Sequence, residues 1–231
     1  MKKQVVFFGF NFLLRLALGV ELPTQNAGQS AEHSNVKSYA SPLSAAIELV
    51  YAPTSFKHYQ WSGGGTNDAR FSGFRVNAEW IAFGDSPYGK PVLGIGVGAA
   101  WISDLAVDSS KFGTLFVIPV EPYIGYRMDY FRNQVVVPYG RLGLGLAYLQ
   151  EEVQVADGKR LSHDSYLGLD LAVGAEVWLN FVDRKSARNL DASTGINNVY
   201  LLVEYFKSRE LGAKWANLAR EEVRLGMRFE F

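Results

Sequence analysis

The chain ends in Val223-Arg224-Leu225-Gly226-Met227-Arg228-Phe229-Glu230-Phe231, in which every second residue is large and apolar. Successive side chains of a strand point to opposite faces, so this segment has one apolar face and one mostly charged face. A soluble protein would bury the apolar face in a core, whereas an outer-membrane barrel turns it to lipid and turns the charges to the lumen. The terminal aromatic residue favours the membrane barrel, because such barrels commonly end on a strand that the barrel-assembly machinery recognises. We therefore predict an assembly signal formed by Val223, Leu225, Met227, Phe229 and Phe231.

Seven earlier segments repeat this alternation, at residues 43–51, 74–82, 93–101, 116–128, 136–148, 167–179 and 199–205. Most of them reach the ~9–11 residues that cross a bilayer at a tilt, whereas strands of soluble proteins average about 5–6 residues. We predict an all-β fold, namely a transmembrane antiparallel up-and-down β-barrel of about eight strands. A soluble ligand-carrying barrel is the alternative, but aromatic residues near the strand ends suit interfacial belts better than a core; these are Trp80, Trp101, Tyr126, Tyr148 and Tyr205.

The apolar faces of these segments carry no charge, and the opposite faces carry acids and bases in comparable number. A barrel of eight strands is just wide enough for side chains to fill, and buried charges must be paired because an unpaired one costs several kcal/mol. We predict a lumen charge network of Glu48, Arg75, Glu79, Glu121, Arg127, Arg141, Asp170, Glu176, Glu204, Arg224, Arg228 and Glu230. The glycines at 94, 96, 98, 143 and 145 either let neighbouring lumen side chains fit or leave a narrow polar pore.

With eight strands, both ends of the barrel segment face the periplasm, and the connections alternate between the two sides of the membrane. We expect extracellular loops at residues 53–69, 103–111, 150–164 and 208–218, and short periplasmic turns at 84–90 and 129–134. The connection 180–198 is long for a periplasmic turn. Asp183 can cap a short helix that runs to Asp191, with Gly195 beyond its end. This helix either lies under the barrel mouth or serves as a linker that terminates the sixth strand.

The N-terminus has the features of an export signal. Lys2 and Lys3 precede a mostly apolar stretch, and small residues at 17–19 fit a signal-peptidase site. We predict a signal peptide at residues 1–19, a flexible lead-in at 20–41 and the barrel at 42–231. The alternative is an amphipathic N-terminal helix. No later stretch approaches the ~18 consecutive apolar residues of a membrane-spanning helix, so insertion in a membrane would require a closed barrel.

The composition excludes several kinds of chemistry. The 231 residues have a formal net charge of +0, so we expect no nucleic-acid partner. The absence of cysteine excludes disulfides, thiolate metal sites and cysteine nucleophiles. No metal-ligand spacing appears, and Gly94-x-Gly96-x-Gly98 lies inside a strand rather than at the strand–turn–helix of a nucleotide site. We therefore predict no metal and no cofactor.

Enzymes embedded in small barrels use a histidine with Ser, Asp or Glu at the outer rim. The three histidines are His33, His58 and His163, and only His163-Asp164-Ser165 groups the right residue types. Neighbours along a strand point to opposite faces, so these three side chains do not converge, and parity places His163 and Ser165 on the lipid face. We predict a polar loop end here and no catalytic residues.

The segment after the sixth strand resembles part of a known family. Asp183 to Asp191, followed by Thr194-Gly195-Ile196-Asn197-Asn198, Tyr200-Leu201 and Glu204-Tyr205, resembles a family of outer-membrane β-barrel proteins of myxobacteria and related predatory bacteria. The closing Met227 to Phe231 is similar to the usual ending of that family. The chain departs from the family at Asn198, where His is frequent, and in its loose match near residues 48–53. The resemblance implies a fold and a location but no reaction.

Together these observations predict an outer-membrane protein of a Gram-negative bacterium that is not an enzyme. The leading hypothesis is a structural or surface-interaction role with a charge-plugged lumen, and the expected partners are outer-membrane lipid and the assembly machinery. The extracellular partner is unknown. A narrow porin-like channel for small solutes or ions is the alternative, and a barrel-embedded enzyme at the outer rim is the second alternative.

Overall fold

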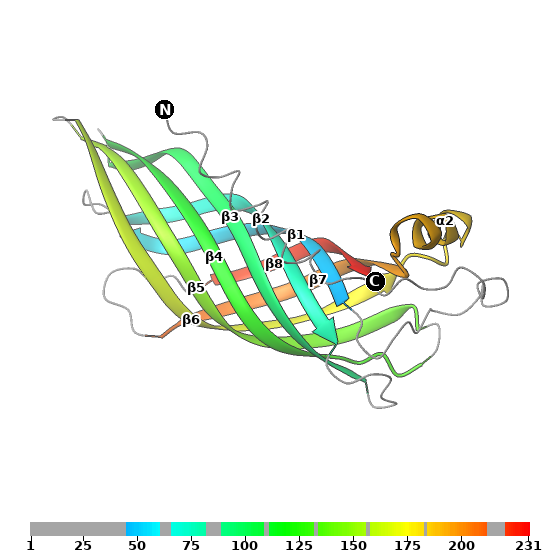
Figure 1. The fold of residues 1–231 in the computed structure, drawn as a ribbon. Coiled ribbons are helices and arrows are strands. Elements are labelled where there is room, and N and C mark those ends of the chain that lie inside the picture. Colours follow the sequence, from blue (N-terminus) through cyan, green and yellow to red (C-terminus); the bar gives the residue numbers. More distant parts are fainter. Residues whose placement is uncertain are drawn as a thin grey trace. The chain divides into compact units, whose positions relative to one another are not determined.

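A computed structural model describes residues 45–60, 66–81, 89–108, 111–131, 134–155, 158–182, 184–211 and 220–231. Eight antiparallel strands close into one barrel in sequence order, and the last strand pairs with the first (Figure 1). The strands are β1 (Ala45–Gln60), β2 (Thr66–Ile81), β3 (Lys90–Asp108), β4 (Lys111–Arg127), β5 (Val136–Val155), β6 (Gly158–Trp178), β7 (Asn198–Glu210) and β8 (Arg220–Glu230). This confirms the predicted fold. The predicted signal peptide and lead-in lie outside the described residues.

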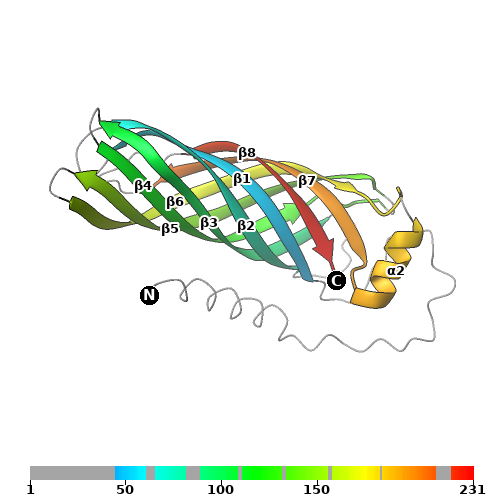
Figure 2. The same ribbon diagram turned by 90° about the horizontal axis from the view of Figure 1, so that it is seen from above.

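The strands are strongly tilted (Figure 2). Following the register from strand to strand around the barrel advances the pairing by about ten residues per circuit, which corresponds to the tilt of roughly 35–45° found in small barrels. We call the end where β1 begins and β8 finishes the terminal end, and the opposite end the hairpin end. The backbone N–H of Phe231 donates to the carbonyl of Ala45 at 2.9 Å, which closes the β1–β8 seam at the terminal end.

The distribution of side chains is the reverse of that in a soluble protein. Leu144, Leu171 and Val203 point outward with 47%, 50% and 41% of their surface exposed. Arg141 and Asp170 point inward and are only 7% and 4% exposed. An outward apolar surface of this kind is stable only in contact with lipid, because a bare apolar belt in water would drive association. The barrel is therefore of the transmembrane type.

The strands are longer than the alternation predicted, so the expected loops are wrong in extent. β1 continues to Gln60, β3 to Asp108 and β5 to Val155, and the returning strands begin correspondingly early, so most of 53–69, 103–111 and 150–164 is hairpin. The loop expected at 208–218 also begins later, after Glu210. The reason is physical. Backbone pairing continues beyond the apolar band, but the apolar alternation that marks a strand stops at the membrane edge.

The connection after β6 contains the predicted helix. The helix α2 (Arg184–Thr194) runs three residues further than the predicted end at Asp191, and Gly195 then adopts a left-handed φ of 73°. Its N–H donates to the carbonyl of Asp191 at 2.8 Å, as expected for a glycine that terminates a helix. The helix lies at the terminal end, beside the beginning of β7 (Figures 1 and 2). No helix within the described residues is long and apolar enough to cross a membrane.

Two side chains, those of Asn180 and Trp178, fix the base of this connection. Asn180 donates from Nδ2 to the carbonyl of Asn197 and accepts from the N–H of Val199, both at 2.8 Å. Trp178 adds a hydrogen bond from its indole Nε1 to Oδ1 of Asn198 at 3.1 Å. The two strand ends are thus joined directly, and this supports the interpretation of α2 as an insertion that terminates β6.

Candidate functional site: the charged lumen

The structure places all twelve predicted lumen charges inside the barrel, where each is buried. Seven of the eight strands contribute at least one of them. The exception is β3, which contributes glycines instead. A β-carbon at Gly94 would overlap the ring of Tyr123, and one at Gly96 would overlap the guanidinium of Arg75. Gly145 of β5 likewise leaves room for the carboxylate of Asp170. These glycines make space for lumen side chains, as the packing interpretation predicted.

Arg228 is the centre of the network near the terminal end. Its guanidinium is completely buried and contacts four carboxylates, those of Glu48 at 2.8 Å, Glu79, Glu176 at 3.6 Å and Glu230 at 3.4 Å. These carboxylates come from β1, β2, β6 and β8 itself. One arginine therefore links strands from different sides of the barrel.

Arg127 of β4 joins the same group from the facing wall. Its Nη2 and Nε lie 2.6 and 3.0 Å from Oε2 of Glu176, and its Nη1 lies 2.6 Å from Oε1 of Glu230. The guanidinium also lies over the ring of Tyr200 at 5.4 Å. The tyrosine hydroxyl donates to Glu230 at 3.3 Å. Aromatic and ionic contacts thus hold the same arginine, a combination that suits the planar guanidinium.

Arg141 occupies the middle of the lumen. It pairs with Glu79 at 2.9 Å, with Glu204 at 3.1 Å and with Glu48. Its guanidinium lies between two tyrosine rings, 5.0 Å from the centroid of Tyr123 and 4.6 Å from that of Tyr139. The Tyr123 hydroxyl donates to Glu79 at 2.8 Å and the Tyr139 hydroxyl to Glu204 at 3.0 Å. Guanidinium, rings and carboxylates together fill this cross-section.

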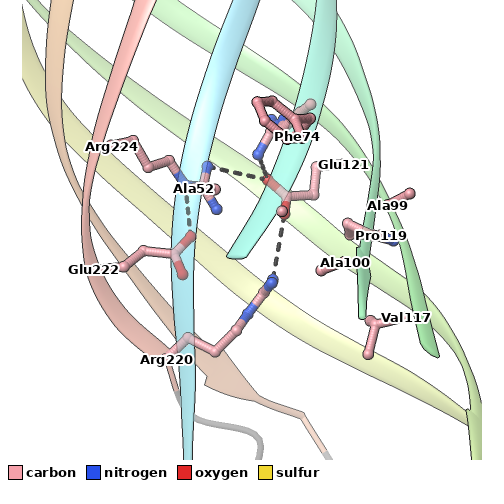
Figure 3. Close-up of a pocket in the computed structure, with 12 residues that line it drawn as sticks. Ala52, Phe74, Ala99, Ala100, Val117, Pro119, Glu121, Arg220, Glu222 and Arg224 are labelled. Atoms are coloured by element: carbon pink, nitrogen blue, oxygen red, sulfur yellow. Dashed lines mark hydrogen bonds and ion pairs between the residues drawn. The ribbon is translucent and has the colours of Figure 1, made fainter. Parts of the chain in front are cut away.

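Glu121 is the centre of the group nearer the hairpin end. Figure 3 shows its carboxylate facing Arg220 and Arg224, at 3.3 and 3.7 Å, and it also pairs with Arg75. Arg224 is held in turn by Glu222 at 2.6 Å and lies 3.3 Å above the ring of Phe206. Two cavities of about 20 Å³ each adjoin this group, and Tyr123 and Arg141 also line the second of them. Each cavity is about large enough for one water molecule.

These groups form one continuous chain of ion pairs along the lumen. Starting at the terminal end, successive charges alternate in sign and each contacts the next: Arg127, Glu176, Arg228, Glu79, Arg141, Glu204, Arg224, Glu121 and Arg75. Alternation satisfies the requirement that a buried charge be paired. The arrangement can hold the strands in register and obstruct the lumen.

Asp170 is the exception among the twelve. Its Oδ1 accepts a hydrogen bond from Ser208 at 2.5 Å, and the Ser208 hydroxyl also bonds to that of Tyr166 at 2.5 Å. No arginine or lysine of the described part of the chain lies within ion-pair distance of it, and its Oδ2 is buried without a hydrogen-bond partner there. The predicted network thus contains one carboxyl that is held by a hydroxyl chain instead of by a cation.

Several lumen residues lie beyond the predicted strands or were given no role. Arg220 and Glu222 continue the inward series of β8 toward the hairpin end, and the parity of the final strand would have found them. Glu151 is buried in a segment that was expected to be loop. The inward tyrosines were given no role, although the parity of their strands places them on the lumen face; these are Tyr123, Tyr139, Tyr166 and Tyr200.

The histidine group at the hairpin end does not converge. His163 is exposed, its ring stacks on Tyr148 with centroids 5.8 Å apart, and its Nδ1 lies 2.6 Å from the tyrosine hydroxyl. Asp164 accepts a hydrogen bond from the backbone N–H of Ser165 instead. Among the described residues no group of three or more potential ligands could hold a metal ion.

Comparison with known proteins gives likeness of fold only. No protein-family description matches the chain, and no curated protein matches it either. Among solved structures, Neisserial surface protein A is 19% identical with a TM-score of 0.44, covering 83% of this chain and 98% of that one. The attachment invasion locus protein Ail of Yersinia pestis, in complex with the heparin analogue sucrose octasulfate, is 15% identical with a TM-score of 0.49, covering 83% and 100%. The outer membrane enzyme PagL is 13% identical with a TM-score of 0.42, covering 79% and 97%. The assignment as a barrel rests on the chain's own closed strand pairing.

Proposed function

We propose that this chain is an outer-membrane barrel of a Gram-negative bacterium, with a structural or surface-interaction role and a lumen closed by its charge network. The observation that carries the proposal is the unbroken series of ion pairs from Arg127 to Arg75 inside a barrel whose outer surface is apolar. A network that links most of the strands favours a rigid anchor over a moving transporter. The outer membrane is the usual location of such barrels.

The hairpin end supports a role at the cell surface. β5 and β6 stay paired to Val155 and Gly158, beyond the outward aromatic side chain of Tyr148. Seven further residues on β5 would raise this hairpin roughly 15–20 Å above the belt at the usual rise and tilt. Outward side chains there are polar or mixed, including Glu152 and Lys159, which pair at 2.5 Å. A stiff projecting hairpin of this kind suits contact with an external partner.

Membrane fractionation combined with heat-modifiable gel migration tests the location. We expect the protein in the outer-membrane fraction, migrating faster before boiling than after it because the closed barrel resists the detergent. A monodisperse protein that needs no detergent would contradict the proposal and favour the soluble ligand-carrying barrel.

A narrow porin-like channel is the second candidate, and the two cavities beside Glu121, each of about 20 Å³, are the observation in its favour. Planar-bilayer recording separates the two functions. A closed lumen should give no steady conductance. A steady conductance that falls on charge reversal at Arg141 or Glu176 would contradict the closed lumen and favour the channel.

We propose no catalytic activity. The nearest candidate is an enzyme at the outer rim that uses His163, whose only described hydrogen-bond partner is Tyr148. A lipid- or peptide-turnover assay would revive the enzyme hypothesis if it detected activity that is lost in His163→Ala.

We also propose that residues 1–19 are a cleaved signal peptide, that 20–41 are a lead-in, and that the assembly machinery recognises the final strand. The support is the charged and apolar pattern of the N-terminus and the terminal phenylalanine. The mass of the protein purified from the envelope tests the cleavage, which should remove about 19 residues. An intact N-terminus would contradict it.

Finally, we propose membership in the outer-membrane barrel family of myxobacteria and related predatory bacteria. The support is the segment around α2 and the closing residues 227–231. The test is whether proteins of that family retain the lumen series of this chain, above all arginines at the positions of Arg141 and Arg228. Their replacement by unrelated residues would contradict the proposal.

A further inference from the structure

Toward the hairpin end, the outward apolar surface of the barrel reaches a different height on different strands. On β5 it runs from Val136 to Tyr148, whereas on β7 it runs only from Val199 to Tyr205. At the terminal end the edge is continuous, because Val177 pairs with Leu201 and Val199 with Phe229. The difference therefore lies at the hairpin end alone, and tilting the whole barrel would not remove it.

The strand register locates the step between β6 and β7, which pair side by side. Lys207 is the partner of Leu171, and Arg209 is the partner of Leu169. Both leucines point outward, 50% and 41% exposed, and the apolar series of β6 continues beyond them to Leu167. Because the strands are tilted, two paired residues on neighbouring strands differ in height by about one residue. Lys207, the partner of Leu171, therefore lies at the height of roughly residue 170 of β6. The apolar surface of β6 thus extends about 8 Å past this lysine.

We call this place the β7–β8 notch and define it by Leu169, Leu171, Tyr205, Lys207, Arg209, Glu221 and Val223. The leucines form its wall on β6, and Tyr205 and Val223, which pair with each other, form its floor. Lys207 pairs with Glu221 at 2.6 Å, and both side chains are more than half exposed. Arg209 is exposed and has no ion-pair partner among the described residues. The notch therefore presents a net positive charge beside lipid-facing leucines.

We propose that the β7–β8 notch seats the phosphate-bearing headgroup of a lipid in the leaflet at the hairpin end. A guanidinium without a partner forms paired hydrogen bonds with phosphate oxygens, and a neighbouring ammonium adds a point charge. The occupant is a lipid instead of free phosphate because acyl chains can cover Leu169 and Leu171 while the headgroup meets Arg209. This inference rests on the proposed insertion in an outer membrane.

Native mass spectrometry of the refolded full chain in detergent tests the site, with diphosphoryl lipid A as the probe. We expect one retained lipid per barrel, and binding about tenfold weaker in the Lys207→Gln, Arg209→Gln double variant. Glu221→Gln should bind more tightly than the unchanged protein, since it frees Lys207. Lys159→Gln is the matched control, because Lys159 is also an exposed lysine paired with a glutamate.

Two further probes identify the chemistry. Lipid A without its phosphates should bind no better to the unchanged protein than to the double variant, and inorganic phosphate should not displace the lipid. Equal binding by the double variant and the unchanged protein would overturn the proposed lipid site at the notch. Displacement of the lipid by inorganic phosphate would overturn it too. Heat-modifiable migration of the same samples keeps the two proposals apart: a folded barrel that binds no lipid refutes only the notch, whereas a chain that is soluble without detergent refutes the proposed location.

Discussion

At the scale of single residues, arginine is what makes this lumen possible. A guanidinium offers five N–H donors in a rigid plane, so one side chain can bridge carboxylates from several strands. Arg228 does this for Glu48 and Glu79, which approach from β1 and β2. A lysine has a single charged atom and could not contact so many partners in fixed geometry. The charges therefore act as cross-links between strands as well as a filling for the lumen.

Asp170 and Glu176 should respond differently to neutralisation. Glu176→Gln removes a charge that pairs with Arg127 and Arg228, and leaves both arginines under-compensated, so we expect a loss of about 3–5 kcal/mol in the free energy of unfolding. Asp170→Asn removes a carboxylate without a cationic partner and keeps an acceptor for Ser208, so we expect little change or a gain. Urea titration of heat-modifiable migration measures both. Equal losses would show that Asp170 is paired after all.

Two glycines on the neighbouring strands β5 and β6 make a matched test of close packing. A β-carbon at Gly174 would overlap the carbonyl oxygen of Val203 and the ring of Tyr139, whereas one at Gly140 would meet only the carbonyl of Ala172 at 3.8 Å. We expect Gly174→Ala to cost about 1–3 kcal/mol and Gly140→Ala to be nearly neutral. The same urea titration decides. A neutral Gly174→Ala would mean that the lumen near Tyr139 is looser than described.

At the scale of elements, the strands serve two environments. The part of each strand in the apolar band alternates strictly, and the part beyond it, as in β5 and β6, keeps its pairing without that alternation. The closing contact of β1 with β8 matters most, since without it the barrel would leave an unpaired edge in lipid. Phe231 contributes to this contact through its backbone, in addition to being the terminal aromatic residue.

Deletion of Phe231 should therefore impair assembly and leave export intact. Two effects act together, the loss of the hydrogen bond to Ala45 and the loss of the terminal aromatic residue. The yield of heat-modifiable protein in the outer membrane measures assembly, and removal of the signal peptide measures export. Phe231→Tyr is the control, because it keeps the backbone contact and an aromatic ring. Normal yield after the deletion would remove the case for an assembly signal.

Replacement of α2 by a short turn should leave the barrel folded. The helix contacts the beginning of β7, while Asn180 and Trp178 join β6 to β7 without it. We expect unchanged heat-modifiable migration when residues 184–195 are replaced by a few Gly and Ser residues. Loss of folding would show that α2 belongs to the barrel and is more than an insertion.

At the scale of the whole molecule, the barrel is asymmetric around its circumference. The apolar band is tall on β4, β5 and β6 and short on β7 and β8, and the charge network inside is continuous. Because the barrel is rigid, the height of its apolar band is fixed. The thickness of the surrounding bilayer must therefore adjust to that height. The short side should thin the membrane locally.

Folding should consequently favour thin bilayers. From Val199 to Tyr205 the band spans about 15 Å at the usual rise and tilt. We expect a higher folded yield in vesicles with 12-carbon acyl chains (about 20 Å thick) than in those with 18-carbon chains. The double variant Lys207→Leu, Glu221→Leu extends the band and should reduce that preference. An unchanged preference in the variant would show that the step does not govern insertion.

The alternation of apolar and polar residues along the sequence determined much of the fold. It established the strand number, the face that each charge occupies and the outward apolar surface, because parity alone decides which side of a strand a residue takes. It also located the turn-prone connection that holds α2. The limits of the strands could not be predicted from it, since the apolar alternation stops at the membrane edge while the backbone pairing continues.

The tertiary structure alone decided which charges meet. Arg228 pairs with Glu48, which is 180 residues away in sequence, because closure of the barrel sets β8 beside β1 and the register sets their heights. The register of β6 with β7 leaves Asp170 opposite the hydroxyl of Ser208 instead of a cation, and it places Lys207 beside the lipid-facing Leu171. Which charges meet across the lumen depends on the tilt of the strands and on the register shifts added over all of them. The local sequence pattern of one strand does not contain this information.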